Sequence, residues 1–166
     1  MLRAIACVSR NWGIGQGQAL LFHIPEDMAW FKEHTMGSTV VLGRKTLESF
    51  PGGRPLPGRR HLVLSHDFET EYENVIIIDC MEKVLKMLNT EEDAWVIGGE
   101  QVYRQLLPHC GEAYITKVDA LPDADHFFPD LDALPGWRLE WQSEERESGG
   151  LRYRFCRYVN EKRQSL

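Results

Sequence analysis

Short runs of apolar residues recur along the chain and predict a set of buried β-strands. Between several of them, apolar residues return at helical spacing and predict α-helices. The expected strands cover residues 2–8, 39–42, 61–64, 75–78, 94–97 and 113–118, and the expected helices cover residues 25–35, 44–50, 81–88 and 101–107. Strands that alternate with helices favour an α/β fold with a mostly parallel sheet.

The last third of the chain has a different pattern. Residues 137–146 and 151–159 are strand-like and are separated by a Ser-Gly-Gly turn at 148–150, which predicts an antiparallel hairpin added to the sheet. The acidic, proline-containing residues 121–135 predict a surface connection before this hairpin. No repeat or linker interrupts the chain, so we expect a single domain over residues 1–166.

Composition narrows the class of protein. A chain of 166 residues that is 43% hydrophobic is long enough to bury a core. No apolar run approaches the roughly 20 residues of a membrane span, and charges at Arg3 and Arg10 leave too little room for a signal-peptide core. The four cysteines form no CxxC pair, so we expect reduced thiols in a cytoplasmic protein without a metal site.

The net charge of −6 argues against a general binder of nucleic acids or membranes. This charge is uneven, because residues 1–60 carry a net charge of +4 and residues 61–166 a net charge of −10. A basic first third in an acidic protein favours a local site for an anion, although side chains from both parts can mix in space.

One acid, Asp27, lies among apolar residues near the start of an expected helix. Pro25 suits the first position of a helix, and acids favour its positive N-terminal end. In such a helix Asp27 and Phe31 lie one turn apart on one face. This face would offer an acid and a ring to a flat heterocycle with N–H donors. The alternative is an ordinary first-turn helix acid.

Two strand ends share one pattern, in which glycine leads from a strand into a helix. One is Gly43 and the other is the pair Gly98-Gly99. Glycine lets backbone N–H groups approach a phosphate at a helix N-terminus. Two such junctions could hold the two ends of a dinucleotide, whereas either alone is compatible with an ordinary tight turn.

Other glycine and arginine segments carry weaker signals. GRKT at 43–46 lacks the spacing of a phosphate-binding P-loop, and the glycines at 13–17 do not match a Rossmann fingerprint. Their density predicts a mobile loop that covers a bound ligand. Prolines stiffen the basic residues 51–60, where an arginine can bind a carboxylate in bidentate fashion, or simply be solvated. No nucleophile elbow or HExxH motif is present.

Six motifs then occur in order: GIG at 13–15, IPEDMAWFK at 24–32, GRKT at 43–46, GRPLPGR at 53–59, VIGGEQVY at 96–103 and YITKVDA at 114–120. Over essentially its full length the chain resembles dihydrofolate reductase of the bacterial, chromosomal type. The resemblance implies a single α/β domain with a mostly parallel eight-stranded sheet, flanking helices and a C-terminal antiparallel hairpin. It also implies a monomer that reduces 7,8-dihydrofolate with NADPH and binds antifolate-type inhibitors.

The resemblance assigns catalytic roles residue by residue. Asp27 matches the carboxylate that bonds N3 and the 2-amino group of the pterin, and Thr116 matches the hydroxyl that bonds this carboxylate. Phe22 and Tyr103 are the other expected catalytic residues. The residues that match the substrate site, including the arginines for the glutamate tail, are Ile5, Cys7, Asp27, Met28, Phe31, Phe50, Arg54, Leu56, Arg59, Ile97 and Thr116.

The expected NADPH site combines the loop over the nicotinamide with the two glycine junctions, of which Gly98-Gly99 matches a cis peptide of the family. Its residues are Cys7, Ile14, Gly15, Gln16, Gly17, Gln18, Ala19, Gly43, Arg44, Lys45, Thr46, Leu64, Ser65, His66, Gly98, Gly99, Glu100, Gln101, Val102 and Tyr103.

Some positions depart from the family pattern. Phe22 replaces a tryptophan whose indole N–H holds a water near the pterin, and Gln101 and His66 replace residues that often face the 2′-phosphate. The helix N-terminus would lower the pKa of Asp27 and burial would raise it. Two alternatives stay open: a reductase of another pterin or pyrimidine on the same fold, and a catalytically idle folate- or nucleotide-binding protein.

Overall fold

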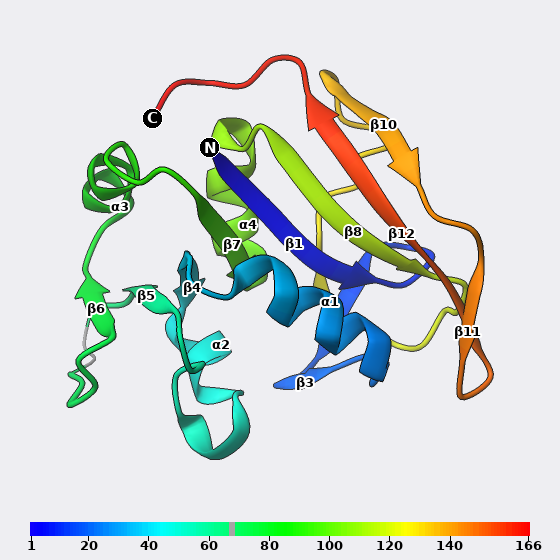
Figure 1. Ribbon diagram of the computed structural model, residues 1–166, viewed down its shortest axis with the longest axis horizontal. Helices are drawn as coiled ribbons and strands as arrows, with labels where there is room; N and C mark the ends of the chain where they lie inside the picture. Colours follow the sequence, from blue (N-terminus) through cyan, green and yellow to red (C-terminus); the bar gives the residue numbers. More distant parts are fainter. Residues whose placement is uncertain (67–68) are drawn as a thin grey trace.

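The computed structural model describes residues 1–66 and 69–166, and its centre is one large β-sheet (Figure 1). The strands of this sheet are β1 (Leu2–Val8), β4 (Thr39–Gly43), β5 (Arg60–Leu64), β6 (Val75–Ile78), β7 (Ala94–Gly98), β8 (Glu112–Val118), β10 (Trp137–Gln142), β11 (Arg146–Ser148) and β12 (Leu151–Asn160). The six strands predicted from apolar runs are all confirmed, with bounds that differ by at most one residue at either end.

The strands follow the order β10-β12-β8-β1-β7-β4-β5-β6. Pairing is parallel from β8 to β6, and β12 lies antiparallel to β8. Both β10 and β11 pair antiparallel with β12, so the predicted C-terminal hairpin is confirmed. Among the described residues the sheet has nine strands rather than the expected eight, because the outer arm of the hairpin is interrupted between Gln142 and Arg146.

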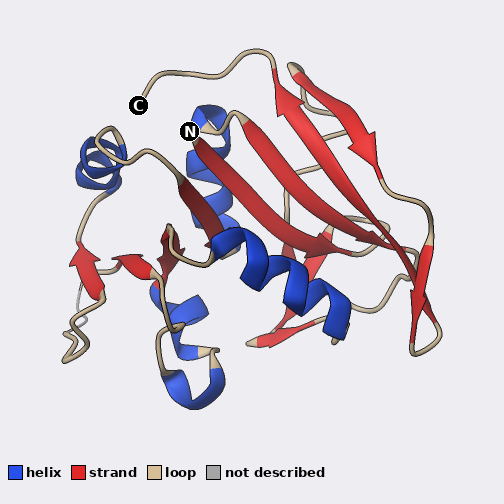
Figure 2. Cartoon of the chain, viewed as in Figure 1, coloured by secondary structure: helices blue, strands red, loops and turns tan. Residues whose placement is uncertain are grey.

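Four α-helices surround this sheet among the described residues, as Figure 2 shows in blue. They are α1 (Pro25–Thr35), α2 (Arg44–Glu48), α3 (Met81–Leu88) and α4 (Glu100–Leu106), with 3-10 turns at Pro51–Gly53 and Leu107–His109. The prediction that the second helix reaches Phe50 is wrong. Phe50 is extended because it precedes Pro51, and a residue before proline avoids the α conformation.

Different helices cover the two faces of the sheet. Val84 of α3 and Leu106 of α4 belong to the largest apolar cluster. Phe31 of α1 and Leu47 of α2 pack in a second cluster on the other face, where α1 crosses in front of the strands in Figure 1. Successive residues of a strand point to opposite faces, so Val41 of β4 joins the first cluster while the residues on either side of it join the second.

A small second sheet changes the interpretation of two loops. It has the order β3-β2-β9 and consists of β2 (Gly13–Gln16), β3 (Ala19–Leu20) and β9 (His126–Phe127). The stretch 121–135 is therefore more than the predicted surface connection. Phe128 and Leu131 are buried, and Phe128 stacks on Trp12. Two-residue strands are too short to show a periodic pattern, which is why the sequence did not indicate them.

Within residues 1–66 and 69–166, no helix is both long enough and apolar enough to cross a membrane.

The packing predicts that Phe128→Ala destabilises the fold. This ring is 1% exposed and contacts the rings of Trp12 and Tyr103 at centroid distances of 6.1 and 4.6 Å. Removing a buried phenylalanine side chain costs about 3–5 kcal/mol in the free energy of unfolding. Urea titration followed by circular dichroism measures it. The exposed Leu134 provides the control, because Leu134→Ala should cost less than about 1 kcal/mol. Equal losses in the two variants would contradict this packing.

Candidate active site

The predicted site residues gather at the carboxyl ends of the parallel strands. Cys7 of β1 is the register partner of Thr116 of β8. Farther along the sheet, Leu42 pairs with Gly98, and Gly43 pairs with Leu64. Ligands of open α/β sheets bind outside this edge. The arrangement therefore places the expected substrate residues around β1 and β8, and the expected cofactor residues around β4, β5 and β7.

Asp27 lies in the first turn of α1 and points toward this edge. Pro25 occupies the start of the helix, where its missing N–H needs no partner. The Thr116 hydroxyl donates a hydrogen bond of 2.5 Å to Oδ1 of Asp27. The Cys7 thiol is a second hydrogen-bond partner of this carboxylate. Since Cys7 and Thr116 are opposite each other on adjacent strands, both donors reach the acid from the same face of the sheet.

The sequence left open whether the pKa of Asp27 is lowered by the helix N-terminus or raised by burial, and in the structure it is raised. Burial raises the pKa of Asp27, and the hydrogen bonds from Thr116 and Cys7 lower it only in part. The pKa of the Cys7 thiol is itself well above its ordinary value, first because of burial and then because of the Asp27 charge. Cys7 is therefore a protonated donor at neutral pH.

Apolar side chains surround the acid on two sides. Cys7 and Phe22 pack against the cluster that contains Ile24 and Phe155. The second cluster brings together the predicted wall residues Ile5, Phe31, Phe50 and Ile97. Leu56 is half-buried, and Met28 is 55% exposed on α1, so the predicted walls include surface that a ligand could cover. Phe22 offers a ring without any polar donor.

Arg59 is a buried cation next to the end of α1. It is 6% exposed, its Nε donates to the Pro57 carbonyl oxygen at 2.9 Å, and its Nη1 donates to the Thr35 hydroxyl at 3.2 Å. No carboxylate of the described residues forms an ion pair with it, and burial lowers its pKa. A buried charge without a counter-ion is a candidate partner for an anionic ligand. The nearby Arg54 is exposed.

The two glycine junctions lie side by side. The Gly98-Gly99 peptide bond is cis, as the resemblance implied. A Cβ atom added to either glycine would lie 3.3 Å from the Thr46 hydroxyl, so a larger residue would crowd this junction, and Gly98 also has a φ of +135° that favours glycine. Arg44 and Lys45 are exposed at the start of α2, and Arg44 pairs with Glu48 at 2.6 Å.

The remaining predicted cofactor residues lie along the same edge. Ser65 and His66 follow β5, with Ser65 half-buried and His66 exposed. Gln101 is exposed on α4, whereas Val102 is buried against Gly43.

Tyr103 takes part in the packing beside the site. Its hydroxyl donates to the Ile5 carbonyl oxygen at 2.6 Å, its ring is 4% exposed, and burial raises its pKa. This bond ties α4 to β1 two residues before Cys7. The catalytic role expected of Tyr103 stays a prediction.

The predicted covering loop is held in the small sheet. Ile14 to Gln16 belong to β2, Ala19 belongs to β3, and the exposed Gln18 lies in the turn between them. The Gly17 amide donates to both carboxylate oxygens of Asp125 at 3.0 Å. The Phe127 amide donates to Oε1 of Glu100 at 2.6 Å, which connects β9 to the start of α4. Sequence reasoning did not identify Asp125, because no local signal links it to a residue so distant in the chain.

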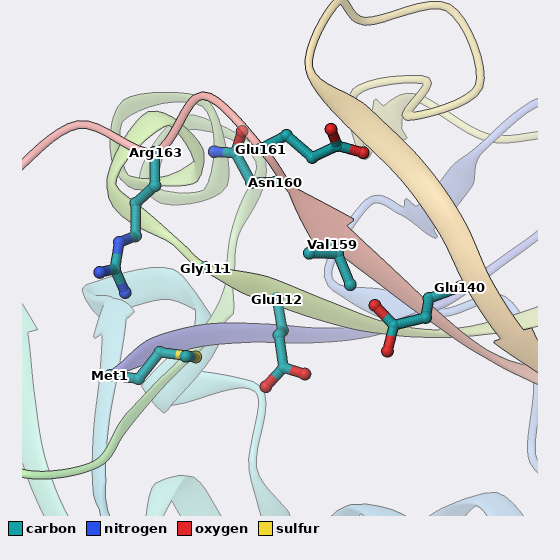
Figure 3. A pocket seen from close by; sticks show the side chains of 8 residues that line it. All are labelled: Met1, Gly111, Glu112, Glu140, Val159, Asn160, Glu161 and Arg163. Atoms are coloured by element: carbon teal, nitrogen blue, oxygen red, sulfur yellow. The ribbon is translucent and has the colours of Figure 1, made fainter.

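A pocket at the opposite end of β1 contains none of the predicted site residues (Figure 3). It is lined by the N-terminal residue, the start of β8, β10, the end of β12 and the residues that follow β12: Met1, Gly111, Glu112, Glu140, Val159, Asn160, Glu161 and Arg163. Its acids are already paired, for example Glu112 with Arg3 at 2.7 Å. The described residues contain no cluster of metal-ligating side chains.

Comparisons with known proteins agree with this arrangement. The family model described as "Dihydrofolate reductase" matches residues 1–160. The dihydrofolate reductase of Neisseria gonorrhoeae is 39% identical over 156 residues, covering 93% of this chain and 95% of the relative. The Bacillus subtilis enzyme is 34% identical over 160 residues, with 95% and 94% covered.

A solved structure is similar over nearly the whole chain. Dihydrofolate reductase from Enterococcus faecalis, in complex with NADP(H) and RAB-propyl, superposes with a TM-score of 0.86 at 30% sequence identity. The match covers 96% of each chain. Sequence and structure thus agree along the same length, and the chain belongs to the dihydrofolate reductase family of NADPH-dependent oxidoreductases.

Proposed function

We propose that this protein reduces 7,8-dihydrofolate to tetrahydrofolate, by hydride transfer to C6 of the pterin and protonation of N5 from water. The observation that carries the proposal is the buried carboxylate of Asp27, held by Thr116 and Cys7 beside an apolar wall. Such an acid can accept hydrogen bonds from the ring N–H and the 2-amino group of a pterin, which are adjacent donors.

Asp27 orients the pterin and polarises it. Its raised pKa brings its titration closer to neutral pH, so the acid can share a proton with the bound ring. The thiol of Cys7 and the hydroxyl of Thr116 hold the carboxylate at its place in the site. Phe22 excludes bulk water without offering a donor, so water reaches N5 past an apolar ring.

The cofactor side supports NADPH as the hydride donor. NADPH, when bound, supplies the hydride that reduces C6. The open junction at Gly98-Gly99, with the Thr46 hydroxyl beside it, lets backbone approach the cofactor closely. Arg44 and Lys45 offer cations to phosphate, and His66 offers an imidazole N–H. The loop at Ile14 to Ala19 closes over the nicotinamide in this proposal.

Arg59 binds the α-carboxylate of the glutamate tail in this proposal. Its guanidinium is buried, held from behind by Pro57 and Thr35, and free of any acidic partner among the residues described. A planar fork of donors matches a carboxylate in bidentate geometry. This second anchor favours a pteroylglutamate over a smaller pterin or a pyrimidine.

The cellular setting is also part of the proposal. All four cysteines are unpaired across the described chain, which fits a reducing cytoplasm. We also propose a monomer that folds as one domain, which light scattering after size-exclusion chromatography would test.

The direct test measures loss of NADPH absorbance when dihydrofolate is added. Turnover supports the proposal. Tight binding of both ligands without turnover would instead support an idle binding protein. Turnover of a tail-free pterin or a dihydropyrimidine at a higher kcat/KM than dihydrofolate would support a reductase of another substrate.

Asp27→Asn should lower hydride transfer by about 10²–10⁴-fold at neutral pH, because the amide cannot take up or share the proton. Low pH should restore part of the rate, since N5 then gains its proton from solvent, and NADPH affinity should stay nearly unchanged. Stopped-flow absorbance measures the step. The control is Glu26→Gln, which alters an exposed acid of the same helical turn. Unchanged turnover in Asp27→Asn would refute the assigned role.

Asp27→Asn should also raise the free energy of unfolding at pH 7. A carboxyl group whose pKa is raised by folding destabilises the folded state when it is ionised. Its favourable contribution is present below the unfolded pKa of about 3.9 and is lost as the pH rises through the folded value. The difference in the free energy of unfolding between the variant and the wild type should therefore vanish near pH 3. Urea titrations at both pH values measure it, and a wild type more stable at pH 7 would contradict the assignment.

Arg59→Lys should raise the KM for dihydrofolate about tenfold or more, because a charge-assisted bidentate contact becomes a single one. The KM for a dihydropterin without the glutamate tail should change little. Steady-state kinetics with both substrates measure this difference. The exposed Arg60, which is not among the predicted site residues, provides the matched control Arg60→Lys. Equal losses with both substrates would argue against the tail contact.

A further inference from the structure

A buried histidine lies beneath the loop that carries the tail-binding arginine. His61, at the second position of β5, is 0% exposed. The Leu56 amide donates to its Nε2 at 3.0 Å, and its Nδ1 lies 3.0 Å from the Arg59 carbonyl oxygen. An amide can only donate and a carbonyl can only accept, so the ring is neutral and carries its proton on Nδ1. One imidazole thus joins the two ends of the segment 56–59.

This connection determines where Arg59 points. Pro55 and Pro57 have no N–H to donate, so the loop has few backbone bonds of its own. The Arg59 side chain folds back onto the Pro57 carbonyl oxygen, inside the segment that His61 closes. The Asn74 side-chain amide also donates to the Arg59 carbonyl oxygen at 3.1 Å. A change at the imidazole therefore moves the guanidinium without touching the ligand.

We propose that His61 is a positioning residue for Arg59, and that only its neutral ring holds the arginine in the conformation that binds the glutamate tail. The inference rests on the proposed function, because it assumes that Arg59 binds this tail. It adds a regulated property, namely that selectivity for a substrate with a tail falls when the pH falls.

The surroundings of the ring support this dependence on pH. A second proton would lie on Nε2, directly opposite the Leu56 amide. Two N–H donors would then face each other inside the protein, which is unfavourable because neither has an acceptor. Burial and the Arg59 charge lower the pKa of His61, while the carbonyl groups of Arg59 and Asn74 act in the opposite direction. The neighbours of His61 on β4 and β6 are the uncharged Val40 and Val75.

The direction of this pH dependence follows from the lowered pKa of His61. A histidine whose pKa is lowered by folding favours the folded loop when it is neutral. This contribution is fully present above the ordinary pKa of about 6.5 and is lost as the pH falls through the lower folded value. Tail binding is therefore intact at neutral pH and weakens on acidification.

The test measures equilibrium dissociation constants of dihydrofolate and of 6-methyl-7,8-dihydropterin, which lacks the tail, between pH 5 and 8. Tryptophan fluorescence of the whole protein reports both without requiring turnover. Titration of Asp27 acts on both ligands and cancels in the ratio of the two constants. The α-carboxyl group of the tail, with an ordinary pKa of about 3.5, stays ionised throughout. In the wild type, the preference for dihydrofolate should be constant above pH 6.5 and should fall as the pH is lowered to 5.

Two substitutions separate positioning from simple packing. His61→Gln places an amide oxygen near the position of Nε2, can still accept from Leu56, and does not titrate. The preference of this variant for dihydrofolate over the tail-free pterin should stay within about twofold of the wild-type value at pH 8. It should not change with pH. His61→Leu removes both bonds and should lower the preference about tenfold at every pH, because the Leu56 amide loses its acceptor. Circular dichroism checks that each variant folds, and the control is His109→Gln, far along the chain.

The outcomes are distinct. A wild-type preference that does not change between pH 5 and 8 would overturn the inference, as would a His61→Gln variant that retains the wild-type pH dependence. If His61→Gln does not fold, His61→Asn replaces it, because its amide keeps a donor near the position of Nδ1. Absence of NADPH oxidation with normal binding of dihydrofolate would refute the proposed function and leave the inference standing.

Discussion

The rest of the structure depends on the parallel pairing of β1 with β7 on one side and β8 on the other. A strand paired on both edges uses its backbone groups within the sheet, so it can be buried. Its register is also strongly specified, because a slip of one residue would turn every side chain to the other face. This register brings Cys7 opposite Thr116, and the Tyr103 hydroxyl holds the Ile5 carbonyl group two residues earlier.

Helix α1 sets the distance between the two charged anchors of the proposed site. Asp27 lies in its first turn, and Thr35, the hydrogen-bond partner of Arg59, is its last residue. These positions are eight residues apart, which is a rise of about 12 Å along a helix. An elongated ligand with ring N–H donors at one end and a carboxylate at the other suits this spacing. In the proposed function, the helix therefore links recognition of a pterin to recognition of a glutamate tail.

Three polar groups of the proposed site, Asp27, His61 and Arg59, have defined hydrogen-bond partners. Asp27 has two donors from neighbouring strands, and His61 has one donor and one acceptor from a single loop. Arg59 is bonded to neutral oxygen atoms. Since an unpaired buried charge is unfavourable, this arginine carries free energy that an anionic ligand can recover.

Hydrophobic pattern alone located the six buried strands and four helices, because each spans enough residues to show its period. It could not reveal β9, with two residues, or the burial of Phe128 and Leu131 inside a polar segment. The end of α2 at Glu48 followed from Pro51 and was predictable in principle. Motifs similar to the family indicated Asp27, Thr116 and Arg59 as candidates, although their roles remain proposals.

By itself, the sequence determined the α/β class, the order of elements and the set of chemically competent residues, since these depend on local pattern and residue type. Only the tertiary structure decided how these residues act on one another. It showed that burial outweighs the hydrogen bonds in setting the pKa of Asp27, that Cys7 is a donor rather than only an apolar wall, and that Asp125 and His61 hold loops of the site. Burial and hydrogen-bond geometry depend on contacts between residues far apart in the chain, and no local pattern encodes them.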